Sequence, residues 1–161
     1  EFIQERLRNI LLEQGRRYDV VDAVLAAQGN NPAGAARAVK ALGTWIARPD
    51  WNLILPAYAR CVRITREYKE RFPLEAQNLV EPSERDLYQA LTIAEKTARS
   101  AGSADDFLNA FIPMIPAINH FFDQVLVMAE DEILRQARLG LVQHIAALPE
   151  GIADLALLQG F

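Results

Sequence analysis

Apolar residues recur along this chain three and four positions apart, the spacing that places them on one face of an α-helix. No segment alternates apolar and polar residues over the length of a half-buried strand. Helical stripes cover residues 2–11, 20–25, 36–42, 57–72, 87–98, 107–122 and 134–148, and a short terminal turn or helix is expected over 152–158. The pattern predicts an all-α fold, a single helical bundle of about seven or eight helices.

Prolines and capping residues indicate where several of these helices begin, bend and end. Ser83 and Ser103 each precede an aspartate by three residues, a spacing that resembles a capping box at a helix start. Pro73 is expected to end the helix before it. Pro113 and Pro116 are expected to kink the helix that contains them, because each removes a backbone donor and crowds the preceding turn.

The composition is that of an ordinary folded protein, with 161 residues, 51% apolar and 24% charged. This length fits one domain over 1–161. No apolar run approaches the roughly 20 residues of a membrane span, so no membrane association is expected. Cys61 is the only cysteine, which excludes an internal disulfide and favours a cytoplasmic location. The chain starts Glu1-Phe2-Ile3-Gln4, without Met or a signal-peptide layout, and is expected to be a fragment of a larger chain.

The charge is unevenly distributed along the chain, although its net value is only −4. Residues 1–71 contain 12 Lys or Arg and 8 Asp or Glu, whereas residues 72–161 contain 5 and 13. The net acidity argues against a general nucleic-acid binder, and no DNA partner is expected. A basic first half can still bind RNA through one face, and a chance distribution of surface charge is the alternative.

No pattern in the chain indicates catalysis, a metal site or a cofactor site. His120 and His144 lack partners at metal-ligand spacing, and the glycines stand alone at helix ends rather than in a phosphate-binding loop. Glu130, Asp131 and Glu132 are expected to open a helix, because negative charge complements the free N–H groups there. We therefore predict no catalytic, cofactor-binding or metal-binding residue in this chain.

Arginines are the candidates for a binding surface. Arg60 and Arg63 lie on the polar face of the 57–72 helix, Arg66 lies on its flank, and Arg135 and Arg138 lie on the 134–148 helix. Guanidinium groups bind phosphate with two parallel hydrogen bonds and stack on unpaired bases. These five residues are the candidate RNA contacts, and a merely solvated charged face is the alternative.

Three aromatic residues, Trp45, Trp51 and Tyr58, offer a second candidate contact, because unpaired bases stack on such rings. Their helical spacing is also typical of core residues, and the core is the expected location. Cys61 falls on an apolar stripe as well, where a small buried thiol is expected.

The segment 121–141 resembles the signature near the C-terminus of the bacterial glycyl-tRNA synthetase beta subunit. In that family, and in arginyl-tRNA synthetases, the signature belongs to a helical anticodon-binding domain named after an Asp-Ala-Leu-Arg motif. Glu132-Ile133-Leu134-Arg135 occupies the motif position here, where the last two residues match and the first two depart. The segments 18–25, 58–66 and 152–155 also resemble parts of that family, in the family's order.

The resemblance implies a C-terminal domain that helps to hold the anticodon arm of glycine tRNA. It also implies that ATP-dependent glycine activation, with ATP and Mg²⁺, occurs on the alpha subunit or on a fused catalytic portion. The implied partners are therefore glycine tRNA and that catalytic part, and the chain itself should perform no chemistry. A helical protein–protein interaction module, motivated by the net acidity and the apolar stretch 107–128, is the alternative function, and a stand-alone helical enzyme is a third.

Overall fold

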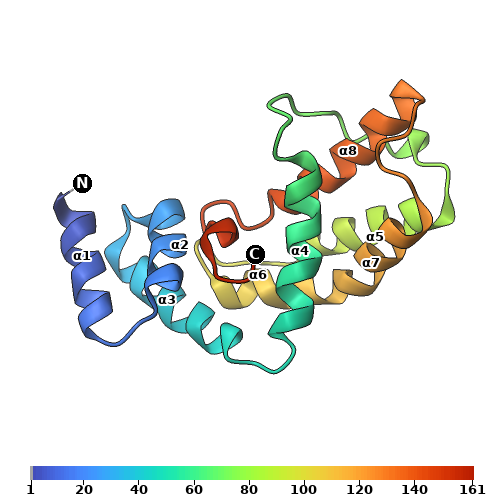
Figure 1. Cartoon of the computed structure of the whole chain (residues 1–161). Coiled ribbons are helices and arrows are strands. Elements are labelled where there is room, and N and C mark those ends of the chain that lie inside the picture. Colours follow the sequence, from blue (N-terminus) through green and yellow to red (C-terminus); the bar gives the residue numbers. More distant parts are fainter. Residues whose placement is uncertain (1) are drawn as a thin grey trace. The chain divides into compact units, whose positions relative to one another are not determined.

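The computed structural model describes residues 2–161, and every regular element among them is helical (Figure 1). The α-helices are α1 Phe2–Glu13, α2 Tyr18–Gln28, α3 Pro32–Ile46, α4 Trp51–Thr65, α5 Pro82–Lys96, α6 Ala104–Phe111, α7 Ile115–Gln124 and α8 Glu132–Ala146. Three short 3-10 turns, η1 Ala76–Asn78, η2 Ile112–Met114 and η3 Leu155–Leu157, lie between or after them. The predicted all-α class with seven or eight helices is confirmed.

The chain forms two compact units. Unit 1 runs to Leu55 and includes Arg99–Asn109 and Pro149–Phe161. Unit 2 comprises Pro56–Ala98 and Ala110–Leu148. Each unit is built from segments that are distant in the sequence, and the expectation of a single domain over 1–161 stays a prediction.

In unit 1, α2 packs against α1, α3 and η3. The centre of α2 is fully buried at Val21 and Val24. At its end, the buried Gln28 side chain donates from Nε2 to the carbonyls of Gly102, at 3.0 Å, and Ile152, at 2.9 Å. One amide therefore joins three separate stretches of unit 1, because buried polar groups need partners and these carbonyls supply them.

In unit 2, α5 packs against α7 and α8 (Figure 1). The prolines that were expected to kink the 107–122 helix interrupt it: α6 ends at Phe111, η2 follows, and α7 restarts at Ile115. The interruption places Met114, Ile118 and Phe121 in the core with at most 1% exposure. The predicted kink is confirmed.

The predicted end of the 57–72 helix is wrong. Helix α4 begins before Pro56, continues through it and ends at Thr65, not at Pro73. Residues 66–72 instead lie against α8, where the buried Gln143 donates from Nε2 to the Glu70 carbonyl at 2.9 Å and accepts from the Phe72 N–H at 3.0 Å. These two bonds satisfy backbone groups that a longer helix would have paired internally.

The predicted cap at Ser83 is also wrong. Helix α5 begins at Pro82, and the Glu84 carboxylate accepts from the backbone N–H groups of Val80, at 2.7 Å, and Glu81, at 3.1 Å. The cap predicted at Ser103 is confirmed, since its Oγ accepts from the Asp106 N–H at 3.1 Å. Carboxylates cap as well as hydroxyls, which is why local spacing selected the wrong residue at the first site.

Gly140 allows the 66–73 segment to approach α8 closely. A Cβ on Gly140 would lie 2.8 Å from the Pro73 carbonyl oxygen and 3.0 Å from that of Phe72. Gly140→Ala is therefore expected to lower the free energy of unfolding by about 1–3 kcal/mol through overpacking. Gly43→Ala is the matched control, because Gly43 lies in α3 with open space around its Cβ position, and it should stabilise by about 0.4–1 kcal/mol. Urea unfolding measures both, and equal effects of the two changes would contradict the close approach.

Candidate RNA-binding surface

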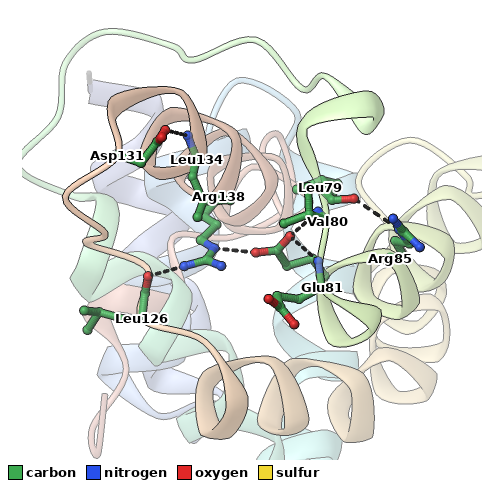
Figure 2. A network of polar contacts seen from close by, with 9 residues as sticks. Leu79, Val80, Glu81, Arg85, Leu126, Asp131, Leu134 and Arg138 are labelled. Atoms are coloured by element: carbon green, nitrogen blue, oxygen red, sulfur yellow. Dashed lines mark hydrogen bonds and ion pairs between the residues drawn. The ribbon is translucent and has the colours of Figure 1, made fainter.

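Helix α8 is the element on which the candidate surface is built. The Asp131 carboxylate accepts from the Leu134 N–H at 2.9 Å and caps the helix start (Figure 2). The expectation that the acids of 130–132 open a helix is confirmed. The first turns of α8 expose Ile133, at 65%, whereas the later turns are almost entirely buried. The first turns of α8 are therefore accessible to a ligand, and its later turns are part of the core.

Arg138 lies on the buried side of α8 with 6% exposure. Its Nε donates to the carboxylate of Glu84, which is fully buried on α5, and its Nη1 donates to the Leu126 carbonyl at 2.6 Å. Figure 2 shows the guanidinium directed into the protein between Leu126 and the start of α5. Because Glu84 also accepts from two backbone N–H groups, this ion pair joins α5, α8 and the segment before α8. This geometry makes Arg138 a structural anchor, and its RNA contact stays a prediction that burial disfavours.

Arg135, the last residue of the motif position, is partly exposed. Its Nη1 donates to the carbonyls of Ala129, at 3.1 Å, and Glu130, at 3.4 Å. The side chain thus folds back over the turn that precedes α8. This arrangement satisfies carbonyls in the 125–131 loop and leaves part of the guanidinium accessible.

Arg60, Arg63 and Arg66 are exposed around the C-terminal end of α4. The Arg60 guanidinium lies 4.6 Å from the centroid of the Phe122 ring, a cation–π contact with α7 that orients it. Arg63 occupies the last turn of α4, and Arg66 follows directly, with its N–H bonded to the Val62 carbonyl at 2.8 Å. The structure therefore places these three predicted residues together on one exposed part of unit 2.

Further basic residues continue this surface beyond the helix. Lys69 and Arg71 are exposed in the stretch that Gln143 holds against α8. We call residues 60–71 the basic segment. The Tyr68 hydroxyl lies 3.6 Å from the Met128 sulfur, so the basic segment adjoins the 125–131 loop, whose Leu126 is 71% exposed. Sequence reasoning missed the exposed Leu126 side chain, and only its position just before the motif helix could have indicated it.

Comparison with known proteins identifies the part of the chain that contains this surface. Residues 54–154, more than half of the chain, match the family model of the DALR anticodon binding domain. The chain belongs to this family. The match includes all of α4 from Ile54 onward, the basic segment and α8, and the family resemblance stated from the sequence is confirmed.

Individual relatives of this DALR domain are glycine–tRNA ligases. The beta subunit from Desulfitobacterium hafniense (strain DSM 10664 / DCB-2) is 36% identical over 161 residues, which is 98% of this chain and 23% of the relative. The beta subunit from Moorella thermoacetica is 35% identical over 159 residues, 97% of this chain and 23% of the relative. The chloroplastic/mitochondrial glycine–tRNA ligase 2 of Arabidopsis thaliana is 34% identical over 163 residues, which is 100% of this chain and 15% of the relative. The DALR chain thus spans less than a quarter of the length of these relatives.

The three aromatic candidates are core residues of the DALR chain. Trp45, Trp51 and Tyr58 are at most 9% exposed. The Trp45 indole donates to Asp105 Oδ1 at 2.7 Å, and the Tyr58 hydroxyl donates to the Ala146 carbonyl at 2.6 Å. Their expected core location is confirmed, and the polar atoms of Trp45 and Tyr58 have partners within the protein.

The histidines do not form part of a cluster of possible ligands. His120 is exposed on α7, and the Nδ1 of His144 lies 2.8 Å from the Gly140 carbonyl oxygen. Within residues 2–161, no group of three or more His, Cys, Asp or Glu side chains is arranged to hold a metal ion. In the same part of the DALR chain, no helix combines the length and the apolar character that crossing a membrane requires.

Cys61 is fully buried on α4, and this burial raises the pKa of its thiol to about 12. The folded thiol should therefore stay protonated and resist iodoacetamide at pH 8, since the thiolate is the nucleophile. In urea the thiol should return to a pKa of about 8.5 and react. Mass spectrometry of the alkylated chain measures both states, and rapid labelling of the folded DALR domain would contradict this burial.

Proposed function

We propose that this chain is the anticodon-arm-binding domain of a glycine–tRNA ligase and supports the charging of tRNA with glycine. The observation that carries this function is the exposed basic segment, which lies inside the family match and is fixed to the motif helix. The names of its relatives support glycine as the amino acid.

Electrostatics explains how a chain with net charge −4 can bind RNA. The basic segment contains five Lys or Arg and only two Glu, so a local positive field faces the solvent there. Guanidinium groups bind phosphate oxygens in pairs, and the released counterions make such binding sensitive to salt. Arg60, Arg63 and Arg66 are the phosphate contacts in this function, and Arg135 is the contact closest to the motif turn.

Amino-acid chemistry belongs to another part of the enzyme in this assignment. Glycine activation, with its ATP and Mg²⁺, takes place on an alpha subunit or a fused catalytic portion in the cytoplasm, and this chain contributes RNA affinity. The division predicts that activation and charging respond differently to loss of the domain. Several separate contacts, each weak on its own, combine to give strong binding of the whole tRNA.

The test compares the full-length synthetase with a form that lacks this domain. ATP–pyrophosphate exchange with glycine reports activation, and glycylation of tRNA reports charging. We expect exchange within about twofold of the intact enzyme and a loss of at least tenfold in kcat/KM for tRNA, equivalent to about 1.4 kcal/mol. Loss of exchange to the same extent, or unchanged charging, would contradict the assignment.

The alternative of a protein-interaction module receives little support from the structure. One of its two motivations was the apolar stretch 107–128, but that stretch supplies much of the core, with Phe107, Phe111 and Phe121 at most 2% exposed. Most of the large apolar side chains of the stretch are therefore covered within the chain, and Leu126 and Met128 at its end are exposed.

A further inference from the structure

Met128 is the one sulfur-containing residue among residues 2–161 whose side chain is open to solvent. The chain has one cysteine and two methionines, at positions 61, 114 and 128. Cys61 is fully buried and Met114 is 1% exposed, whereas Met128 is 42% exposed at a turn of the 125–131 loop. An oxidant in solution therefore reaches one sulfur of the folded chain, because the other two are covered by the core.

The Met128 sulfur is in contact with a hydroxyl of the basic segment. The Tyr68 hydroxyl donates to Met128 Sδ at 3.6 Å, and a thioether sulfur is only a weak acceptor. The Tyr68 ring packs edge-on against Phe72, with ring centroids 5.7 Å apart, and the Phe72 N–H donates to Gln143 on α8. A weakly bonded donor is thus held in place beside an accessible sulfur.

The contact of Met128 joins the 125–131 loop to a different element from the other bonds of the loop. Arg135 and Arg138 donate from α8 to carbonyl oxygens on both sides of Met128. Val127 is buried in the core beside it. The backbone around Met128 is therefore tied to α8, and the Met128 side chain extends from it to the basic segment.

Oxidation would change the acceptor that the Tyr68 hydroxyl faces. In the reaction with hydrogen peroxide, a sulfur lone pair attacks one peroxide oxygen, the O–O bond breaks, and the second oxygen leaves as water. The sulfur loses two electrons and becomes a sulfoxide, and the peroxide gains them. The sulfoxide oxygen carries partial negative charge, so it accepts from a hydroxyl at the ordinary O–H···O distance of about 2.7–2.8 Å.

We propose that Met128 is a reversible oxidation site for peroxides, and that its sulfoxide binds the Tyr68 hydroxyl and holds the 125–131 loop more firmly against the basic segment. The inference goes beyond the proposed function and does not depend on it. Methionine has three rotatable side-chain bonds, so either epimer of the sulfoxide can turn its oxygen toward the hydroxyl. Oxidation of a core methionine disrupts packing, but here the sulfur lies at the surface beside a donor.

The site itself is tested by treating the full-length synthetase with hydrogen peroxide and mapping its peptides by mass spectrometry. Met128 should gain one oxygen at least about tenfold faster than Met114, because Met114 becomes accessible only when the fold opens. Methionine sulfoxide reductases specific for the two epimers should together remove that oxygen. Oxidation of the two methionines at equal rates, or a Met128 sulfoxide that the reductases leave in place, would overturn the inference.

Hydrogen exchange of the same samples tests the effect on the loop. After oxidation, the backbone amides of residues 125–131 should exchange about threefold more slowly, because a stronger hydrogen bond opposes local opening. Tyr68→Phe keeps the ring but lacks the donor, so oxidation should not slow exchange in this variant. Met128→Leu should show no response in the loop, and it controls for sulfurs elsewhere in the synthetase. Unchanged or faster exchange in the oxidised wild type, or equal slowing in Tyr68→Phe, would overturn the inference.

Discussion

Arg138→Met is expected to lower the free energy of unfolding by about 3–5 kcal/mol, the usual cost of leaving one member of a buried ion pair alone. Glu84 is fully buried and would lose the guanidinium that compensates its charge. The Leu126 carbonyl would lose its donor at the same time. Urea unfolding of the chain, followed by far-ultraviolet circular dichroism, measures the loss.

A double variant distinguishes the lost charge pair from lost packing. Adding Glu84→Gln to Arg138→Met removes the isolated charge but keeps an oxygen for the N–H groups of Val80 and Glu81. The double variant should recover at least half of the stability lost in the single variant, since the two residues are directly coupled. Arg85→Met is the control, because Arg85 is exposed on α5, next to Glu84. This substitution should lower the free energy of unfolding by less than about 1 kcal/mol. If Arg138→Met loses no more stability than Arg85→Met, the structural role of Arg138 is contradicted.

The triple variant Arg60→Ala, Arg63→Ala, Arg66→Ala is expected to reduce the affinity of the full-length synthetase for glycine tRNA by at least tenfold. If each arginine binds one phosphate, the slope of log affinity against log salt should become shallower by about 2, at roughly 0.7 per contact for single strands. Binding titrations between low and moderate salt measure both quantities.

The control for this variant removes the same charge from another place. Arg6, Arg37 and Lys40 are exposed on α1 and α3, and their replacement with alanine should change affinity and salt slope much less. Replacing the three basic-segment arginines with lysine should restore most of the salt slope but less of the affinity, because lysine keeps the charge and loses the bidentate geometry. Equal losses in the two alanine variants would mean that only net charge matters.

Most of the fold was predictable because its signals are local. Helical periodicity fixed the class, and Asp131 and Ser103 indicated helix starts through bonds to residues only three positions away. The end of α4 was not predictable in this way. Gln143 pairs with Glu70 and Phe72, more than seventy positions earlier, and no local pattern indicates such a contact.

The candidate surface was predictable to a similar extent. Arg60 and Arg63 lie on one face of a helix, so their spacing alone indicated that they act together. Arg138 has the same residue type, but its burial depends on Glu84, fifty-four positions away, and the sequence gives no sign of that pairing.

Cross-linking of the full-length synthetase to glycine tRNA that carries a photoreactive base in the anticodon loop tests the central claim most directly. The cross-linked peptides are identified by mass spectrometry. We expect them to come from the basic segment and from the 125–131 loop. Cross-links that all fall outside residues 54–154 would contradict the claim that this DALR domain holds the anticodon arm.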